Sequence, residues 1–362
     1  AVMLSAETAA GQYPVETVES MSRVCLEAET SSDYQLERAF LNREFSRVDQ
    51  SIAMAALFTA NHLPVRALQH IRALAEQGHN AVQPFAALAL FDDPALHLRL
   101  AKAYSQAHHP SNKRLGPIPS WPAHERIRVG YFSADFHNHA TAWLMAELFE
   151  QHDRTRFEWW AFSFGPASDD PIRRRLEAAF DHFIDVRGQS DAAVAQLARS
   201  LEIDIAVDLK GFTQDQRAGI FAQRAAPVQV NYLGYPGSMG LPEMDYLMAD
   251  PLVLPDDLKP ACSEQVVRLP HCYQPNDRQR RAAATPTRAS QGLPEAGVVF
   301  CSFNNNYKIT PEVFGLWMDI LREVPGSVLW LYLRHAGAQA RLRSEAQQRG
   351  VDPPRLVFAT TL

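Results

Sequence analysis

Side chains that could take part in catalysis follow the short apolar runs in the second half of the sequence. The run IRVGYFS (127–133) leads into ADFHNHATAW, which brings Asp135, His137, Asn138 and His139 just beyond it. A histidine titrates near neutral pH, so it can act as a general base or bind a substrate hydroxyl. Histidines of an ordinary surface loop would show the same spacing.

Two later apolar runs also end in polar, turn-forming residues. IDIAVDL (203–209) is followed by KGFTQDQRAG, in which Gly211 permits a turn and Thr213 can cap a helix. VQVNYLG (228–234) ends at Gly234 and continues into further glycines, which let the backbone approach a ligand closely. Both segments are equally compatible with simple turns, and the glycine spacing is not that of a GxGxxG phosphate loop.

A lysine follows another apolar run near the end of the sequence. GVVFCSF (297–303) leads into NNNYK, which ends at Lys308 and precedes a helix that Thr310 can cap and Pro311 can start. Helix-end amides and an ammonium group can converge there on a diphosphate. The glycines of a Walker loop are missing, which argues against an NTPase, and a solvated surface lysine would fit the pattern as well.

These candidate residues need a sheet that brings the ends of several strands together. Apolar, β-rich runs, which also include 157–164, 182–186 and 244–250, alternate with amphipathic stretches that have helical periodicity, at 141–152, 171–180, 190–201 and 214–224. Strands alternating with helices predict an α/β fold with a parallel sheet covered on both faces. In such sheets ligands bind at the carboxyl ends of the strands.

The pattern changes along the chain and divides it into four parts. We expect a helical region at 1–108, because apolar residues from about Ser32 to His108 recur every three or four positions, and a proline-rich linker at 109–126. A first α/β domain is expected at 127–290 and a second at 291–362. The second has three candidate strands, fewer than an open sheet usually has, so we expect it to be incomplete in this sequence.

Composition excludes several classes of protein. The 362 residues include 35 Lys and Arg against 41 Asp and Glu, so a general nucleic-acid binder is disfavoured. No run of about 18 apolar residues indicates a membrane helix. The start of the sequence lacks the features of a secretory signal, so we expect a cytoplasmic protein without membrane partners. The 4 cysteines contain no CxxC pair, which favours reduced thiols over disulfides or a zinc site.

Four motifs, in one order along the chain, resemble a known family. They are VGYFSADFHNHATAW, DLKGFTQDQRAGIFAQRAAPVQVNYLGYPGSMGLPEMDYLMAD, SEQVVRLPHCYQPND and GVVFCSFNNNYKITPEVFGLWMDILREVPGSVLWLYL. They resemble the catalytic region of O-linked N-acetylglucosamine transferases and SPINDLY proteins, glycosyltransferase family 41. The helical stretch before them is similar to the end of that family's tetratricopeptide solenoid.

The resemblance implies a fold and an activity. The fold would be a GT-B type pair of Rossmann-like domains, the second incomplete here, after a tetratricopeptide-like helical region. The activity would be inverting transfer of a sugar from a nucleotide sugar to Ser or Thr of a protein or peptide acceptor, with no metal and no cofactor. UDP-N-acetylglucosamine is the expected donor. The alternatives are GDP-fucose, or an inactive fragment that binds peptides as a scaffold, because the family's downstream His-Thr-Thr motif is missing.

The resemblance also assigns site residues, each by its place in a motif. His139 matches a histidine that lies over the sugar, Lys308 the lysine that holds the donor diphosphate, and Tyr307 its neighbour in the active site. The residues expected to contact the donor are Asn305, Thr213, Leu233, Gly234, Tyr235 and Pro236.

Overall fold

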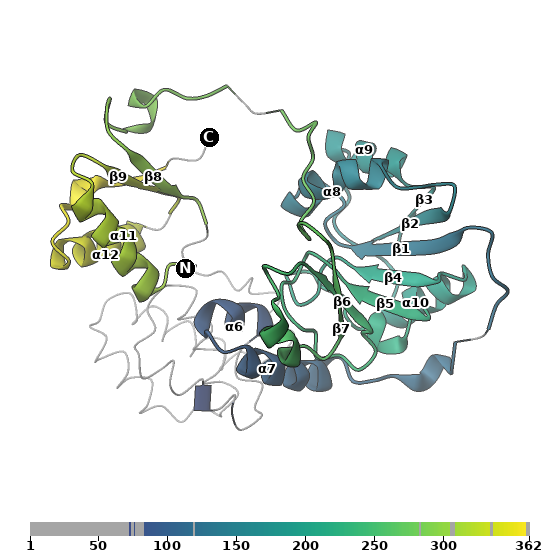
Figure 1. Ribbon diagram of the computed structural model, residues 1–362. Coiled ribbons are helices and arrows are strands. Elements are labelled where there is room, and N and C mark those ends of the chain that lie inside the picture. Colours follow the sequence, from purple (N-terminus) through teal and green to yellow (C-terminus); the bar gives the residue numbers. More distant parts are fainter. Residues whose placement is uncertain are drawn as a thin grey trace, which may run out of the picture. The chain divides into compact units, whose positions relative to one another are not determined.

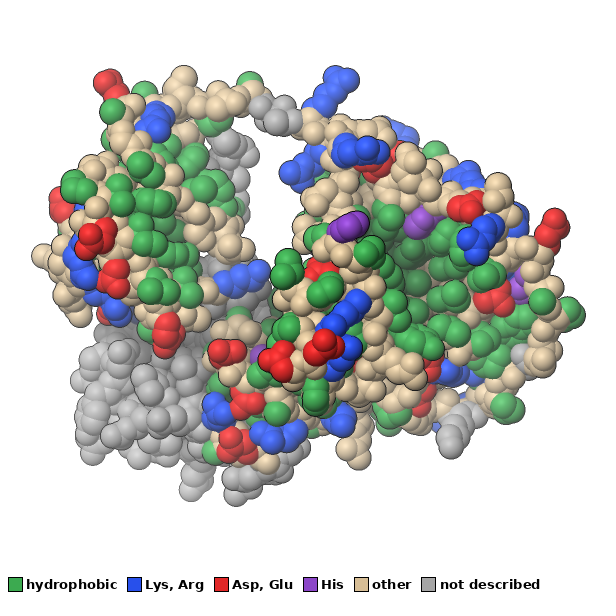
Figure 2. All heavy atoms as spheres, in the orientation of Figure 1, with side chains coloured by type: hydrophobic (Ala, Val, Ile, Leu, Met, Phe, Trp, Pro, Cys, Tyr) green, Lys and Arg blue, Asp and Glu red, His purple; other side chains and the backbone are tan. Residues whose placement is uncertain are grey.

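The computed structural model describes residues 72, 73, 76, 83–118, 120–281, 284–304, 308–333 and 336–359. The chain forms two compact units, Ala73–Arg281 and Ala282–Leu362 together with Ala1–Arg72, and each is described by itself (Figure 1). Most of the expected tetratricopeptide-like helices lie outside the described residues. Basic and acidic side chains are interspersed on the face shown in Figure 2.

A seven-stranded parallel sheet forms the centre of the first unit. Its strand order is β3-β2-β1-β4-β5-β6-β7, and every adjacent pair is parallel. The first six strands follow the doubly wound order of a Rossmann-like sheet. The strands are β1 (Ile127–Ser133), β2 (Phe157–Ser163), β3 (His182–Asp185), β4 (Ile205–Asp208), β5 (Val228–Asn231), β6 (Tyr246–Ala249) and β7 (Gln265–Arg268).

Helices cover both faces of this sheet. On one face α8 (Ala140–Glu150) and α9 (Pro171–Ala179) pack against alternate strand residues such as Val129 and Tyr131. On the other face α10 (Asp191–Ser200) packs around Phe132 and Phe162, whose rings stack at 4.3 Å between centroids. The two-sided burial explains the nearly continuous apolar strands, and the predicted parallel α/β sheet is confirmed.

A helical hairpin before the sheet packs against its second face. It consists of α6 (Pro84–Leu90) and α7 (Pro94–His108), each with proline in its first turn, where no intrahelical N–H bond is lost. The Asp93 side chain caps α7 by accepting from Leu96 N at 3.0 Å. Ser105 Oγ donates to Met239 O at 2.7 Å, which ties α7 to the segment between β5 and β6.

The proline-rich segment at 109–126 lies along the first unit and is bonded to it. Arg199 Nη1 donates to Leu115 O and Gly116 O, both at 3.0 Å. Trp121 Nε1 donates to Asp204 Oδ1 at 2.9 Å, just before β4 begins. The segment is therefore fixed at several points on the first unit.

The expected helix at 214–224 is wrong. The segment consists of turns and a short 3₁₀ helix, η2 (Phe221–Gln223). Asp215 and Arg224 have φ of 59° and 60°, left-handed values that an α-helix cannot contain. Arg217 donates instead to Asp191 Oδ1 at 2.7 Å and to Gln189 O at 2.6 Å, which holds the turns in place.

The described part of the second unit is a smaller α/β unit. Its sheet has the order β10-β9-β8, all parallel. The strands are β8 (Val299–Ser302), β9 (Val328–Leu331) and β10 (Leu356–Phe358), and the helices are α11 (Pro311–Glu323) and α12 (Ala336–Gln348). Phe314 and Met318 of α11 are buried against this sheet in a core of their own. In the part of the chain that the structure describes, no helix is long and apolar enough to cross a membrane.

We expect Leu176→Ala to lower the free energy of unfolding by about 2–5 kcal/mol, because Leu176 of α9 is 0% exposed and its loss leaves a cavity. Urea unfolding of the purified chain, followed by circular dichroism, measures the change. The matched control is Leu252→Ala, at a position 88% exposed, which should change stability by less than about 0.5 kcal/mol. Equal losses in the two variants would contradict the assignment of the core.

Candidate active site

The polar residues singled out from the sequence gather at the carboxyl edge of the first sheet. β1, β4 and β5 are neighbours in the sheet, so the loops that follow them leave the same edge side by side. This edge is where doubly wound sheets bind ligands. His139 follows β1, Thr213 follows β4, and Leu233 follows β5.

A buried ion pair joins the first two of these loops. Lys210 Nζ lies 2.8 Å from both carboxylate oxygens of Asp135. Lys210 is 4% and Asp135 6% exposed. A single buried charge would be strongly unfavourable, so each group needs the other. The sequence placed both residues at strand ends but did not indicate that they pair. Each residue comes two positions after the end of its strand, and the two strands are adjacent. This spacing could have indicated that the two side chains meet.

His139 lies at the start of α8, directly beside this pair. Its Nδ1 accepts from Thr141 N at 3.2 Å, so its side chain caps the helix, and lies 3.4 Å from Asp135 Oδ2. The side chain is 42% exposed. Burial lowers the pKa of His139; Asp135 acts to raise that pKa, and Lys210 and His137 act to lower it.

A second buried carboxylate lies on the strand end next to Lys210. Asp208 Oδ1 accepts from Lys210 N at 2.8 Å and from Gly211 N at 3.1 Å. Its Oδ2 has no hydrogen-bond partner within the described residues, and neither has Oδ1 of Asn231, its register partner on β5. Burial raises the pKa of Asp208 to about 6.

The loop after β5 comes very close to the loop after β4. Leu233 has a left-handed φ of 63°. A Cβ on Gly234 would lie 1.9 Å from Leu209 O, so only glycine fits there. The Tyr235 side chain is 1% exposed and packs in the core, with its ring 5.5 Å from that of Phe212. The ring therefore anchors the loop after β5 in the core of the first unit.

Thr213 does not cap an α-helix, in contrast to the expectation, because none follows it. Its Oγ1 donates to Lys210 O at 2.8 Å and closes the turn after β4. The half-buried Thr213 thus stiffens the backbone that carries the Lys210 ammonium.

Lys308 lies in the second unit, between β8 and α11, and is exposed. Thr310 caps α11 as expected, its Oγ1 accepting from Val313 N at 3.3 Å. Pro311 is the first residue of that helix. The site candidates Asn305 and Tyr307 lie outside the described residues.

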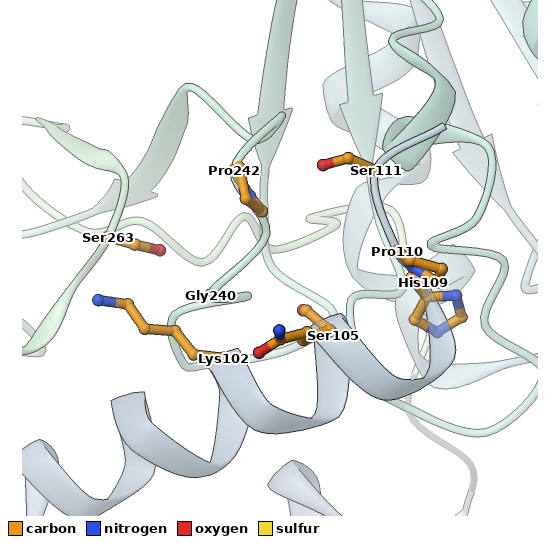
Figure 3. Close-up of a pocket in the computed structure, with 9 residues that line it drawn as sticks. Lys102, Ser105, His109, Pro110, Ser111, Gly240, Pro242 and Ser263 are labelled. Atoms are coloured by element: carbon orange, nitrogen blue, oxygen red, sulfur yellow. The ribbon is translucent and has the colours of Figure 1, made fainter. Parts of the chain in front are cut away.

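Two of the cavities in the first unit lie beside helices. One of about 670 Å³ opens beside the first turn of α8 and is lined by Ala140, Trp143, Leu144, Gln279, Arg280 and Arg281. The other, of about 410 Å³, lies between α7 and the segment before β6; Figure 3 shows Lys102 and Ser105 on the helix facing Gly240 and Pro242. None of the candidate site residues lines either cavity. Among the described residues, no group of three His, Cys, Asp or Glu side chains could hold a metal ion.

Comparisons with known proteins agree with the resemblance seen in the motifs. The family model "Glycosyl transferase family 41" matches residues 106–284 and 274–361. The chain is 35% identical over 294 residues to an Arabidopsis thaliana protein described as a probable UDP-N-acetylglucosamine–peptide N-acetylglucosaminyltransferase, SEC, covering 77% of this chain and 30% of that protein. It is 26% identical over 352 residues to the Caenorhabditis elegans UDP-N-acetylglucosamine–peptide N-acetylglucosaminyltransferase, covering 65% and 30%.

A solved structure is similar as well. A mutant of the Thermobaculum terrenum O-GlcNAc transferase matches with a TM-score of 0.71 at 28% sequence identity, over 93% of this chain and 66% of that one. The chain spans about a third or less of the length of the Arabidopsis and Caenorhabditis relatives.

We expect Asp208→Asn to gain stability relative to the wild type as pH rises. The pKa of Asp208 in the folded chain is about 6, against an ordinary value of 3.8, so its contribution to stability is full below the lower value and is lost as pH rises through the higher. An amide has no charge to bury. The difference in unfolding free energy between variant and wild type should therefore rise by up to about 3 kcal/mol between about pH 4 and 7.

Urea unfolding of both proteins across this pH range measures the difference. Asp250→Asn is the control with the opposite sign, because backbone N–H groups of Val253, Tyr273 and Leu252 lower the pKa of Asp250. Its stability relative to the wild type should fall only as pH rises toward the ordinary value of 3.8, and should stay nearly constant between pH 4 and 7. The same slope in the two variants would refute the burial argument for Asp208.

Proposed function

Because the chain belongs to glycosyl transferase family 41, we propose that the protein transfers N-acetylglucosamine from UDP-N-acetylglucosamine to Ser or Thr hydroxyls of a protein, with inversion at the anomeric carbon. The observation that carries the proposal is the group of polar residues at the carboxyl edge of a doubly wound sheet, inside the segment that matches the family. The names of the Arabidopsis and Caenorhabditis relatives support both the donor and the peptide acceptor.

Inverting transfer needs an acceptor hydroxyl in line with the anomeric carbon and a leaving diphosphate whose charge is stabilised. Lys308 would provide that charge, since its exposed ammonium stands just before α11, whose first N–H groups favour an anion. Asn305 and Tyr307, which precede Lys308 in the sequence, would contact the nucleotide and the reacting sugar. No metal is needed in this scheme.

The sugar would lie against the loops of the first sheet. Leu233, Gly234 and Pro236 would form its wall together with Thr213, and Tyr235 would hold this wall from the core. His139, half-exposed at the start of α8, would contact the sugar or the acceptor. The cavity of about 670 Å³ next to Ala140 is wide enough for part of a peptide, and Arg280 and Arg281 would favour acidic residues in it.

The remaining parts of the scheme follow the family. The two α/β units would be the two Rossmann-like domains of a GT-B fold. The sequence before α6, which resembles the end of a tetratricopeptide solenoid, would bind the protein acceptor.

Calorimetric titration of the full-length protein with UDP, UDP-N-acetylglucosamine and GDP-fucose tests the donor. We expect saturable binding of both uridine nucleotides and none of GDP-fucose. Labelled sugar should then appear on a Ser- or Thr-containing peptide. Binding of GDP-fucose alone would make the protein a fucosyltransferase, whereas peptide binding without any nucleotide binding would make it a scaffold.

We expect Lys308→Ala to reduce transfer by two or more orders of magnitude without loss of folding, because it removes charge stabilisation that grows as the diphosphate leaves. Initial rates of transfer by the full-length protein measure the effect. Lys259→Ala, an exposed lysine of the first unit paired with Asp256, is the control and should retain the wild-type rate. Full activity of Lys308→Ala would disprove this role of Lys308.

A further inference from the structure

A lysine has no obvious reason to be buried under the candidate active site. Lys210 is 4% exposed, on the turn after β4, and its ammonium group bonds both oxygens of Asp135. An apolar residue would fill the same space without the cost of burying a charge, so the pair calls for an explanation beyond stability.

The position of the pair suggests that explanation. Asp135 Oδ2 also accepts from Thr141 Oγ1 at 3.3 Å and lies 3.4 Å from His139 Nδ1. A carboxylate beside a histidine normally draws a proton onto the ring and leaves it positively charged. The Lys210 ammonium already balances this carboxylate, so it removes the reason for His139 to become charged.

The hydrogen bonds of the ring agree with an uncharged state. Thr141 N–H points at His139 Nδ1, which must therefore carry a lone pair to accept. In a neutral imidazole the proton is then on Nε2. Nδ1 faces Asp135 and the helix, so Nε2 lies on the other side of the ring, and no hydrogen bond from it is found within the described residues.

One other titratable group acts on His139 in the same direction as Lys210. The His137 ring, with its centroid 5.8 Å away, acts against a positive charge on His139. Asp170 of the segment before α9 accepts from Asn138 N at 3.0 Å, and Arg173 of α9 donates to Phe136 O at 3.1 Å. Both are engaged with the backbone of the loop. Burial is the largest influence on the pKa of His139, and the charges that act on the ring are those of Asp135 and Lys210, with a further contribution from His137.

We propose that Lys210 is a positioning residue for His139: by neutralising Asp135 it keeps the imidazole uncharged with its proton on Nε2, so that His139 offers an N–H donor and not a base to the sugar or the acceptor. The proposal rests on the proposed transferase function only for the identity of the group that the His139 N–H binds, the sugar or the acceptor. The state of the ring is a property of the chain alone, and burial, which lowers the pKa of His139, acts in the same direction.

The wild-type protein gives the first test. Histidine labelled with ¹⁵N in the full chain shows by its nitrogen shifts which ring atom carries the proton, and His139→Gln identifies the signal. Near neutral pH we expect protonated Nε2 and unprotonated Nδ1 on His139. A protonated Nδ1, or a doubly protonated ring, would overturn the proposal. The measurement needs no donor, so its outcome does not depend on the transferase function.

Two variants test the role of Lys210 itself. In Lys210→Met the unbalanced Asp135 should raise the pKa of His139 above its wild-type value, as followed by NMR titration. In the double variant Asp135→Asn/Lys210→Met, which removes both charges of the pair and so leaves neither unbalanced, the pKa should stay below the ordinary 6.5. Lys259→Met, at an exposed position, should leave His139 unchanged.

The variants separate positioning from structure. A folded Lys210→Met with the wild-type pKa for His139 would reduce Lys210 to a structural residue and refute the proposal. If only the double variant folds, a His139 pKa above 6.5 in it would refute the proposal equally, because the ring would then be charged without any help from Asp135.

Discussion

Two opposite charges, withdrawn from water together, hold the candidate site in shape. Asp135 and Lys210 stand on loops that leave adjacent strands, and neither could be buried alone. Their contact fixes the distance between the loops after β1 and β4. Close packing fixes the position of the third loop, the one after β5, because Gly234 lies against Leu209 O with no room for a side chain. The three loops at this edge of the sheet are therefore held in contact with one another, although they come from distant parts of the sequence.

The sequence predicted the elements of the first sheet well, for a simple physical reason. A strand buried on both faces must be apolar along its whole length, and such runs are easily recognised. The sequence pattern did not indicate strand β7, because QVVR is short and half-polar. β7 lies at the edge of the sheet, where a strand is less buried. The segment at 214–224 has helical periodicity, yet left-handed residues and the bonds of Arg217 impose turns on it. Those contacts are made with residues distant in sequence, which a local pattern does not contain.

The site was predictable in its location but not in its internal contacts. Strand ends in a parallel sheet identify the edge at which His139 and Leu233 lie. The sequence could not show that Tyr235 turns into the core, or that Lys210 lies beneath His139, because both depend on how the loops pack on one another. Burial also decides the protonation of Asp208, and burial is a property of the folded chain.

The proline-rich segment behind the sheet has a mechanical consequence. The Arg199 guanidinium donates to Leu115 O and Gly116 O of the segment, and also to Gln223 O and Arg224 O of the first unit. It therefore links the segment to the end of η2. α7 is braced further by Tyr104, whose ring lies 4.9 Å from that of Phe212 in the loop after β4. α7 is therefore in direct contact with the loop that carries Lys210 and Thr213, and a substitution that displaces α7 would displace that loop as well.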